Sequence, residues 1–147
     1  MNSAIQQFNE LLTRRDQDGR RILRYNIEGD FDTSDFPELQ TELIRPLQPP
    51  LYFLKLYYYI DRDGRLPPSP VEYRTDRPIT AADILYSINA LYDTPLRQEN
   101  VNYYILFDRD YDSLLKEQNP TLRDAMGDFY LQRLVPRQDG YLVDIYD

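Results

Sequence analysis

The sequence predicts a single α+β domain: a mostly antiparallel sheet with a C-terminal β-hairpin, covered by several short amphipathic helices. Two observations predict this class. Apolar residues recur at helical spacing in short segments near the N-terminus and after residue 80, whereas other segments are rich in aromatic and β-branched residues at strand spacing. No internal repeat, low-complexity tract or long linker divides the 147 residues, so one domain spans residues 1–147.

The N-terminal third predicts two helices with one strand between them. Apolar residues at helical spacing follow Ser3, a good N-cap, and stop before the turn sequence at residues 16–19. Leucine, tyrosine and isoleucine then alternate with polar residues over 23–28, the pattern of a half-exposed strand. An acidic loop is predicted at 30–35, and a short helix from Phe36 to about Ile44 before Pro46.

Residues 51–60, LYFLKLYYYI, predict the most pronounced strand of the chain. Its even-numbered face is Tyr52, Leu54, Leu56, Tyr58 and Ile60; its odd-numbered face is Leu51, Phe53, Lys55, Tyr57 and Tyr59. Both faces are mostly apolar or aromatic, so both need cover. A turn at 61–64 and a proline-rich connector follow, and lead into a short strand over 71–74.

The C-terminal half predicts one well-delimited helix and the hairpin. Thr80 and Asp83 form a capping signal before an apolar helical face that ends at Thr94–Pro95. The run 103–107 is compatible with either strand or helix, and Leu114–Leu115 belong to a further helix. Strands over 129–135 and 141–146, joined by a five-residue loop containing Gly140, predict the antiparallel hairpin.

Composition excludes several function classes. The chain has no histidine and no cysteine, so a histidine general base, a thiolate nucleophile, a disulfide and the usual zinc sites are excluded. A net charge of -8 disfavours nucleic acid as a partner. The N-terminus lacks a basic, apolar leader and no apolar run is long enough for a bilayer, so we expect no membrane partner and a cytoplasmic location.

No metal or cofactor site is predicted. Asp108, Asp110 and Asp112 have the spacing of the first ligands of a calcium loop, but Ser113 replaces the turn glycine and Asn119 the closing glutamate. A solvated acidic turn is therefore expected, with no physiologically relevant calcium binding. The five glycines are scattered singly, so no phosphate-binding glycine loop is present.

The 14 tyrosines favour a function in protein–protein contact, because tyrosine combines a large apolar ring with a polar tip. We expect a non-enzymatic structural or adaptor protein. An acidic regulator that mimics nucleic acid and blocks a basic partner is the alternative, motivated by the net charge, and a small carboxylate hydrolase ranks third.

The interface is expected on the odd-numbered face of the strand, at Phe53, Lys55, Tyr57 and Tyr59. If the even-numbered face fills the core, a partner must cover the odd one, since a lone lysine opposes burial inside the chain. Changing Tyr57 and Tyr59 to arginine is then expected to leave the melting temperature of the monomer nearly unchanged and to abolish assembly.

Two stretches carry a resemblance to a known family: residues 78–85, PITAADIL, and residues 126–129, MGDF, which lead into the terminal hairpin. Through them the last two-thirds of the chain resemble a small uncharacterised α+β domain of giant DNA viruses that has relatives in plants and fungi. The resemblance implies an origin in a large DNA virus, a role as a minor component of its particle, and the virion in place of the cytoplasm as location. It transfers no functional residue.

Overall fold

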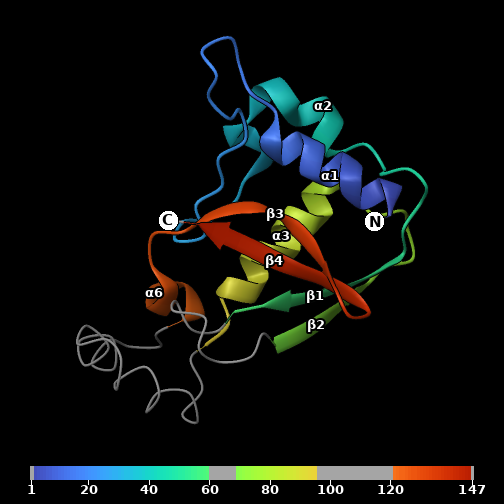
Figure 1. Ribbon diagram of the computed structural model, residues 1–147, viewed down its shortest axis with the longest axis vertical. Coiled ribbons are helices and arrows are strands. Elements are labelled where there is room, and N and C mark those ends of the chain that lie inside the picture. The colour runs from blue at the N-terminus through green and yellow to red at the C-terminus, as the bar shows by residue number, and fades with distance from the viewer. Residues whose placement is uncertain (1, 60–68, 96–120, 147) are drawn as a thin grey trace.

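The computed structural model describes residues 2–59, 69–95 and 121–146, and it confirms the α+β class. Four strands form one sheet in the order β2-β1-β4-β3 (Figure 1). Both hairpins, β1 with β2 and β3 with β4, are antiparallel, whereas β1 and β4 pair in parallel at the centre of the sheet. The strands are β1 (Phe53–Tyr58), β2 (Ser69–Arg74), β3 (Tyr130–Arg137) and β4 (Gly140–Tyr146).

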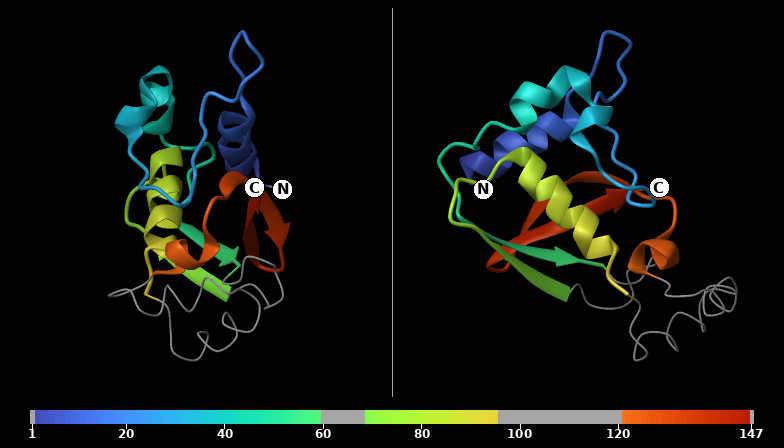
Figure 2. Two further views of the ribbon diagram at one scale, coloured as in Figure 1. Left: turned by 90° about the vertical axis from the view of Figure 1, so that its left-hand side faces the viewer. Right: turned by 180° about the vertical axis from the view of Figure 1, so that it is seen from behind.

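The helices lie behind the sheet and along one edge. In Figure 1 helix α3 (Ala81–Tyr92) crosses behind the strands, and Figure 2 shows it from the other side. Helix α1 (Ser3–Thr13) runs beside β3, and the short α2 (Gln40–Leu43) and α6 (Leu122–Met126) complete the helical side. Within the described ranges no helix covers the opposite face of the sheet, which we call the outer face.

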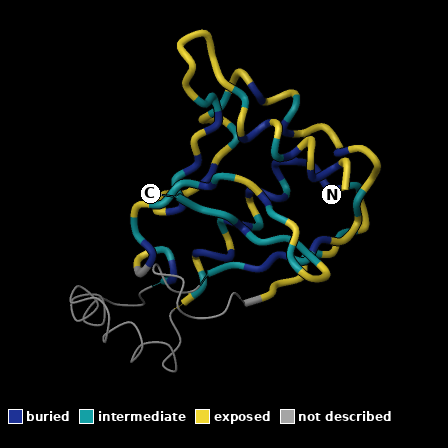
Figure 3. The backbone as a smooth tube through the Cα atoms, in the orientation of Figure 1, coloured by how far each residue is buried: buried dark blue, intermediate teal, exposed yellow. Residues whose placement is uncertain are grey.

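The core lies between the sheet and the helices, where the backbone is most buried (Figure 3). Leu54 and Leu56 of β1 are buried there, so this part of the even-numbered face fills the core, whereas Tyr52 of the same face is 50% exposed. The apolar faces of α1 and α3 are buried as the spacing predicted. The other main contributors are Leu131, Leu134 and Val143 of the C-terminal hairpin.

Helix α3 begins where the sequence predicts. The Thr80 hydroxyl accepts the backbone N–H of Asp83 at 3.0 Å, and the Asp83 carboxylate accepts that of Thr80 at 2.9 Å. These two backbone N–H groups have no acceptor within the helix, and the reciprocal side-chain contacts satisfy both. Helix α1 is capped one residue earlier than expected, by Asn2, whose side chain accepts the N–H of Ala4 at 2.7 Å.

The predicted strand over 23–28 is wrong. Its alternating burial is present, with Leu23, Tyr25 and Ile27 buried, but only one isolated bridge joins this segment to β3. The ladder stops because a turn closes at Gly29 and because β3 carries a register shift between Leu131 and Arg133. The predicted loop at 30–35 contains a 3₁₀ turn, Thr33–Asp35, and the helix predicted to begin at Phe36 starts as another, Pro37–Leu39, before α2.

The β3 edge of the sheet is blocked along its length. The first residues of β3 are hydrogen-bonded to the segment that contains Tyr25, because the Leu131 N–H donates to Tyr25 O at 2.9 Å. The Asn9 side chain of α1 then pairs with Leu134, donating to its carbonyl at 2.9 Å and accepting its N–H at 2.8 Å. Pro136 follows and has no N–H to offer. These three features prevent another strand from adding at this edge.

A polar cluster around Asn89 joins α3 to α6 and to the segment after Tyr25. The Asn89 side-chain oxygen accepts hydrogen bonds from Tyr25 Oη at 3.0 Å, from the Phe31 N–H at 3.0 Å and from Arg123 Nη2 at 2.9 Å. Arg123 also pairs with Asp30 at 2.6 Å. Burial raises the pKa of Tyr25 to about 12, although the Arg123 charge opposes the shift.

Candidate functional site

The four residues predicted to form an interface do not all face solvent. Phe53 is exposed at 37%, with the Arg74 guanidinium 4.3 Å from its ring centre. Tyr57 is only 7% exposed, and the Lys55 side chain is 21% exposed. Tyr59 lies beyond the end of β1 and packs against the core. Phe53 is therefore the member of this set that is available for contact.

Lys55 and Tyr57 are engaged by the turn of the C-terminal hairpin. Lys55 Nζ pairs with Asp139 Oδ2 at 2.9 Å, and Tyr57 Oη donates to Asp139 Oδ1 at 2.6 Å. Tyr57 Oη also lies 3.2 Å from Gln138 Oε1. The premise that Lys55 opposes cover from within the chain is therefore wrong, because the lysine is paired. Because Asp139 and Gln138 cover Tyr57, a Tyr57→Arg substitution is expected to destabilise the fold and not to leave its stability unchanged.

The cluster shifts the pKa values of its members. The hydrogen bond from Tyr57, followed by that from Lys55, lowers the pKa of Asp139. The same contacts with Asp139 raise the pKa of Lys55 and of Tyr57. All three shifts favour a lysine cation, an aspartate anion and a neutral tyrosine, so the cluster is formed at neutral pH and weakens toward both extremes.

Asp139→Asn is expected to lower stability at neutral pH by an amount that disappears in acid. A carboxylate with a lowered folded-state pKa stabilises the fold above its unfolded pKa, about 3.8, and this contribution is lost as pH falls through the folded value. Urea midpoints of wild type and variant, measured from neutral pH to below 3.8, should therefore converge in acid. The exposed Glu38→Gln is the control. A gap that is the same at every pH would contradict the assignment.

The outer face is basic, although the chain is acidic. Strand register places side chains of all four strands on it, and two arginines from the segment before Tyr25 stack on its tyrosines. The cations are Lys55, Arg74, Arg133, Arg137, Arg21 and Arg24, and the carboxylates are Glu72, Asp139 and Asp144. The outer face therefore carries six positive and three negative groups, although the net charge of the chain is -8.

Aromatic rings lie among these charges. Tyr130 and Tyr146 lie side by side across β3 and β4, with ring centres 5.7 Å apart. Arg24 stacks on Tyr130 at 5.0 Å, and Arg21 on Tyr146 at 5.4 Å. Together with Phe53, these rings give the outer face the mixture of arginine and aromatic side chains that is enriched where proteins bind one another.

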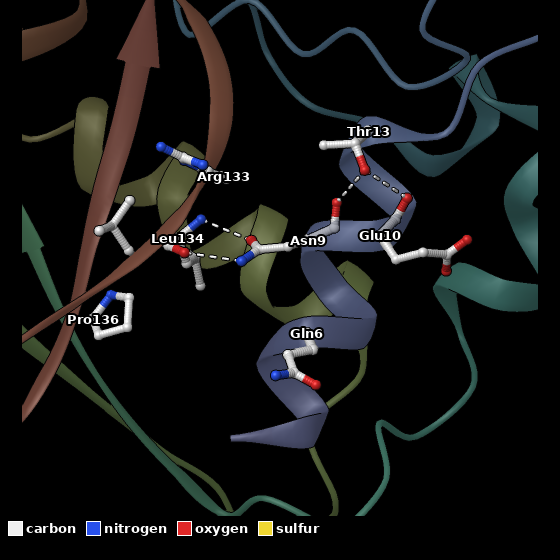
Figure 4. Close-up of a pocket in the computed structure, with 8 residues that line it drawn as sticks. Gln6, Asn9, Glu10, Thr13, Arg133, Leu134 and Pro136 are labelled. Carbon is white, nitrogen blue, oxygen red and sulfur yellow. Dashed lines mark hydrogen bonds between the residues drawn. The ribbon is translucent and has the colours of Figure 1, made fainter. Parts of the chain in front are cut away.

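A groove of about 440 Å³ separates α1 from the β3 edge (Figure 4). The Asn9 amide points across it to Leu134, with Gln6 and Thr13 on the helix and Pro136 on the strand. Its lining is largely apolar, and the hydrogen-bonding groups of Leu134 are already satisfied by Asn9. The arrangement closes a sheet edge.

In the described part of the chain, no group of three or more acidic side chains could hold a metal ion. The pKa values of Asp32 and Asp139 are lowered, by the Ser34 N–H and by Tyr57 respectively. The acidic turn at 108–112, the run 103–107 and the predicted helix at Leu114–Leu115 lie outside the described residues.

Sequence reasoning identified the outer face of β1 but missed the arginines beside it. A signal was present, since residues 14–24 contain five arginines. The net charge of -8 gives no indication of this local cluster of positive charge. Only the fold shows that Arg21 and Arg24 meet tyrosines more than a hundred residues later in the chain.

No family model, curated protein or solved structure matches this chain. The resemblance to the giant-virus domain therefore stays a prediction. None of the helices within the described ranges combines the length and the apolar character that crossing a membrane requires.

Proposed function

We propose that this chain is a non-enzymatic structural or adaptor protein that docks an acidic partner protein on the outer face of its sheet. The observation that carries the proposal is the excess of positive charge, interleaved with aromatic rings, on one face of a chain whose net charge is -8. If the resemblance to the giant-virus domain is a true relationship, the partner belongs to the virus particle.

Local charge decides the partner's chemistry. At physiological ionic strength charges are screened beyond about 8 Å, so an approaching protein responds to the face it meets more than to the total charge. The outer face would attract carboxylates and repel basic surfaces. Phe53, exposed at 37%, and the tyrosine pair of β3 and β4 supply apolar contact area once the partner has docked.

Two exposed residues on the outer face offer a test that leaves the core intact. We expect Phe53→Glu with Arg133→Glu to abolish capture of the partner from the native source, because the substitutions remove one aromatic contact and reverse one charge. Phe53 is 37% exposed and the Arg133 side chain 56%. Capture is read by mass spectrometry, and the partner is then purified and its affinity measured by calorimetry.

The matched control is Ile44→Glu with Arg45→Glu. It makes the same two kinds of change at exposed positions after α2, away from the sheet. Thermal melts should show that both variants are folded, with a modest loss for the outer-face variant because Arg133 pairs with Asp144 across the hairpin. A partner lost with the outer-face variant, retained by the control and acidic at its contact region supports the proposal. A basic partner that the outer-face variant still captures would overturn it in favour of nucleic-acid mimicry.

A further inference from the structure

A loop rich in arginine adjoins the outer face beside Tyr146. Residues 14–22 fold back on themselves, with Asp16 N–H bonded to Arg20 O at 2.8 Å and Ile22 N–H to Arg14 O at 3.0 Å. The Asp16 carboxylate closes the turn by accepting the N–H groups of Asp18 and Arg20 at 2.8 and 3.0 Å. The loop is therefore built mainly by its own backbone and by Asp16, and its turn does not depend on the side chains of Arg20 and Arg21.

Three arginines of this loop, together with Arg24 just after it, line one polar pocket of about 340 Å³. They are Arg15, Arg20, Arg21 and Arg24, with Gln132 and Tyr146 contributed by the sheet. No carboxylate is among the described lining residues, and none pairs with these four guanidinium groups in the described ranges. Arg14 differs, because its guanidinium pairs with Glu10 at 2.8 Å and with Glu42.

The guanidinium groups are positioned without being neutralised. Tyr146 lies under Arg21 and Tyr130 under Arg24, while Arg15 Nη1 donates to the Gly19 carbonyl at 2.6 Å. An aromatic ring orients an arginine but leaves its outward N–H groups available. Arg21 Nη1 is buried and has no hydrogen-bond partner among the described residues, which is unfavourable for a charged group unless a ligand supplies an acceptor.

We infer that this arginine pocket binds a phosphoryl group. A phosphate monoester carries close to two negative charges and three terminal oxygens, which suit several guanidinium forks that line one pocket. A long polyanion fits less well, because a pocket of about 340 Å³ accommodates a compact anion and leaves the other charges of a long chain without these arginines as partners. The same chemistry serves a free phosphate ester and a phosphorylated side chain of a protein.

The inference goes beyond the docking function and is tested without any partner. Inorganic phosphate is titrated into the isolated protein while calorimetry and the arginine Nε–H signals in NMR spectra are recorded. We expect saturable binding that shifts the signals of the four pocket arginines. Arg20→Gln with Arg24→Gln, both at exposed positions, should weaken binding by about tenfold or more, since hydrogen bonds to charged groups are lost. Arg14→Gln with Arg45→Gln removes the same charge outside the pocket and should change affinity less than about twofold.

Two peptides of one sequence, with serine or phosphoserine, separate the sources of the phosphoryl group. A phosphopeptide that binds more tightly than inorganic phosphate identifies a protein side chain, and equal affinities identify a free ester; the unphosphorylated peptide should not bind. Three results would overturn the inference: no saturation below about 1 mM phosphate, equal weakening in both double variants, or tighter binding of a single-stranded oligonucleotide than of the phosphopeptide. Circular dichroism establishes that each variant is folded, and Arg21→Gln gives a second, single-site check.

Discussion

Replacing Gly140 by alanine is expected to lower the free energy of unfolding by about 3 kcal/mol, because the added methyl group has no room. A Cβ built at Gly140 would lie 2.3 Å from the backbone oxygen of Lys55 and 3.0 Å from its carbonyl carbon. Backbone atoms of a central strand cannot move aside as a flexible side chain does. The parallel pairing of β1 with β4 begins at the next residue pair, Leu56 with Tyr141, so this pairing must shift or break.

The sign of the change in the free energy of unfolding distinguishes crowding at Gly140 from the usual effect of replacing glycine by alanine. Where the backbone permits it, replacing glycine by alanine stabilises a protein by about 0.4–1 kcal/mol, since the unfolded chain loses freedom. Gly29→Ala is the matched control, because its added Cβ would meet only the Asn26 oxygen at 3.9 Å. Urea unfolding should show a large loss for Gly140→Ala and little change for Gly29→Ala. Equal stability of the two variants would show that β1 and β4 do not approach as described.

Asn89→Ala is expected to cost about 2–4 kcal/mol, because three donors lose one acceptor together. Tyr25, Arg123 and the Phe31 N–H all donate to the Asn89 side-chain oxygen. The Arg123 side chain is only 11% exposed, so water does not readily replace the lost bond. Alanine is the better helix former, and that gain of about 0.7 kcal/mol is too small to offset the loss.

Asn89→Asp is the control for this cluster. The carboxylate keeps an acceptor in the same place and adds an attraction to Arg123, so a much smaller change in the urea midpoint is expected. The alanine variant should also free the Tyr25 hydroxyl from its partner, which tyrosine absorbance during an alkaline titration would report against a Tyr25→Phe reference. Equal destabilisation by alanine and aspartate would mean that shape, and not hydrogen bonding, decides the role of Asn89.

The elements that could be predicted are those specified by neighbouring residues. Helix α3 carries its own capping pair, Thr80 and Asp83, and its apolar positions recur every three or four residues. The C-terminal hairpin likewise follows from two strand-forming runs joined by a short loop. The predicted strand at 23–28 failed because a ladder needs a second strand in register, and β3 shifts its register after Leu131.

The sequence by itself determined the fold class, the main helices, the hairpin and the core-facing side of β1, because each depends on a local period or cap. The tertiary structure alone decided what the other side of β1 meets. Asp139, 84 residues after Lys55, pairs with that lysine and covers Tyr57 because β4 inserts beside β1 in parallel. The same long-range packing brings the arginines of the 14–24 loop to Tyr130 and Tyr146. Such contacts depend on how distant segments pack, and no local pattern encodes that.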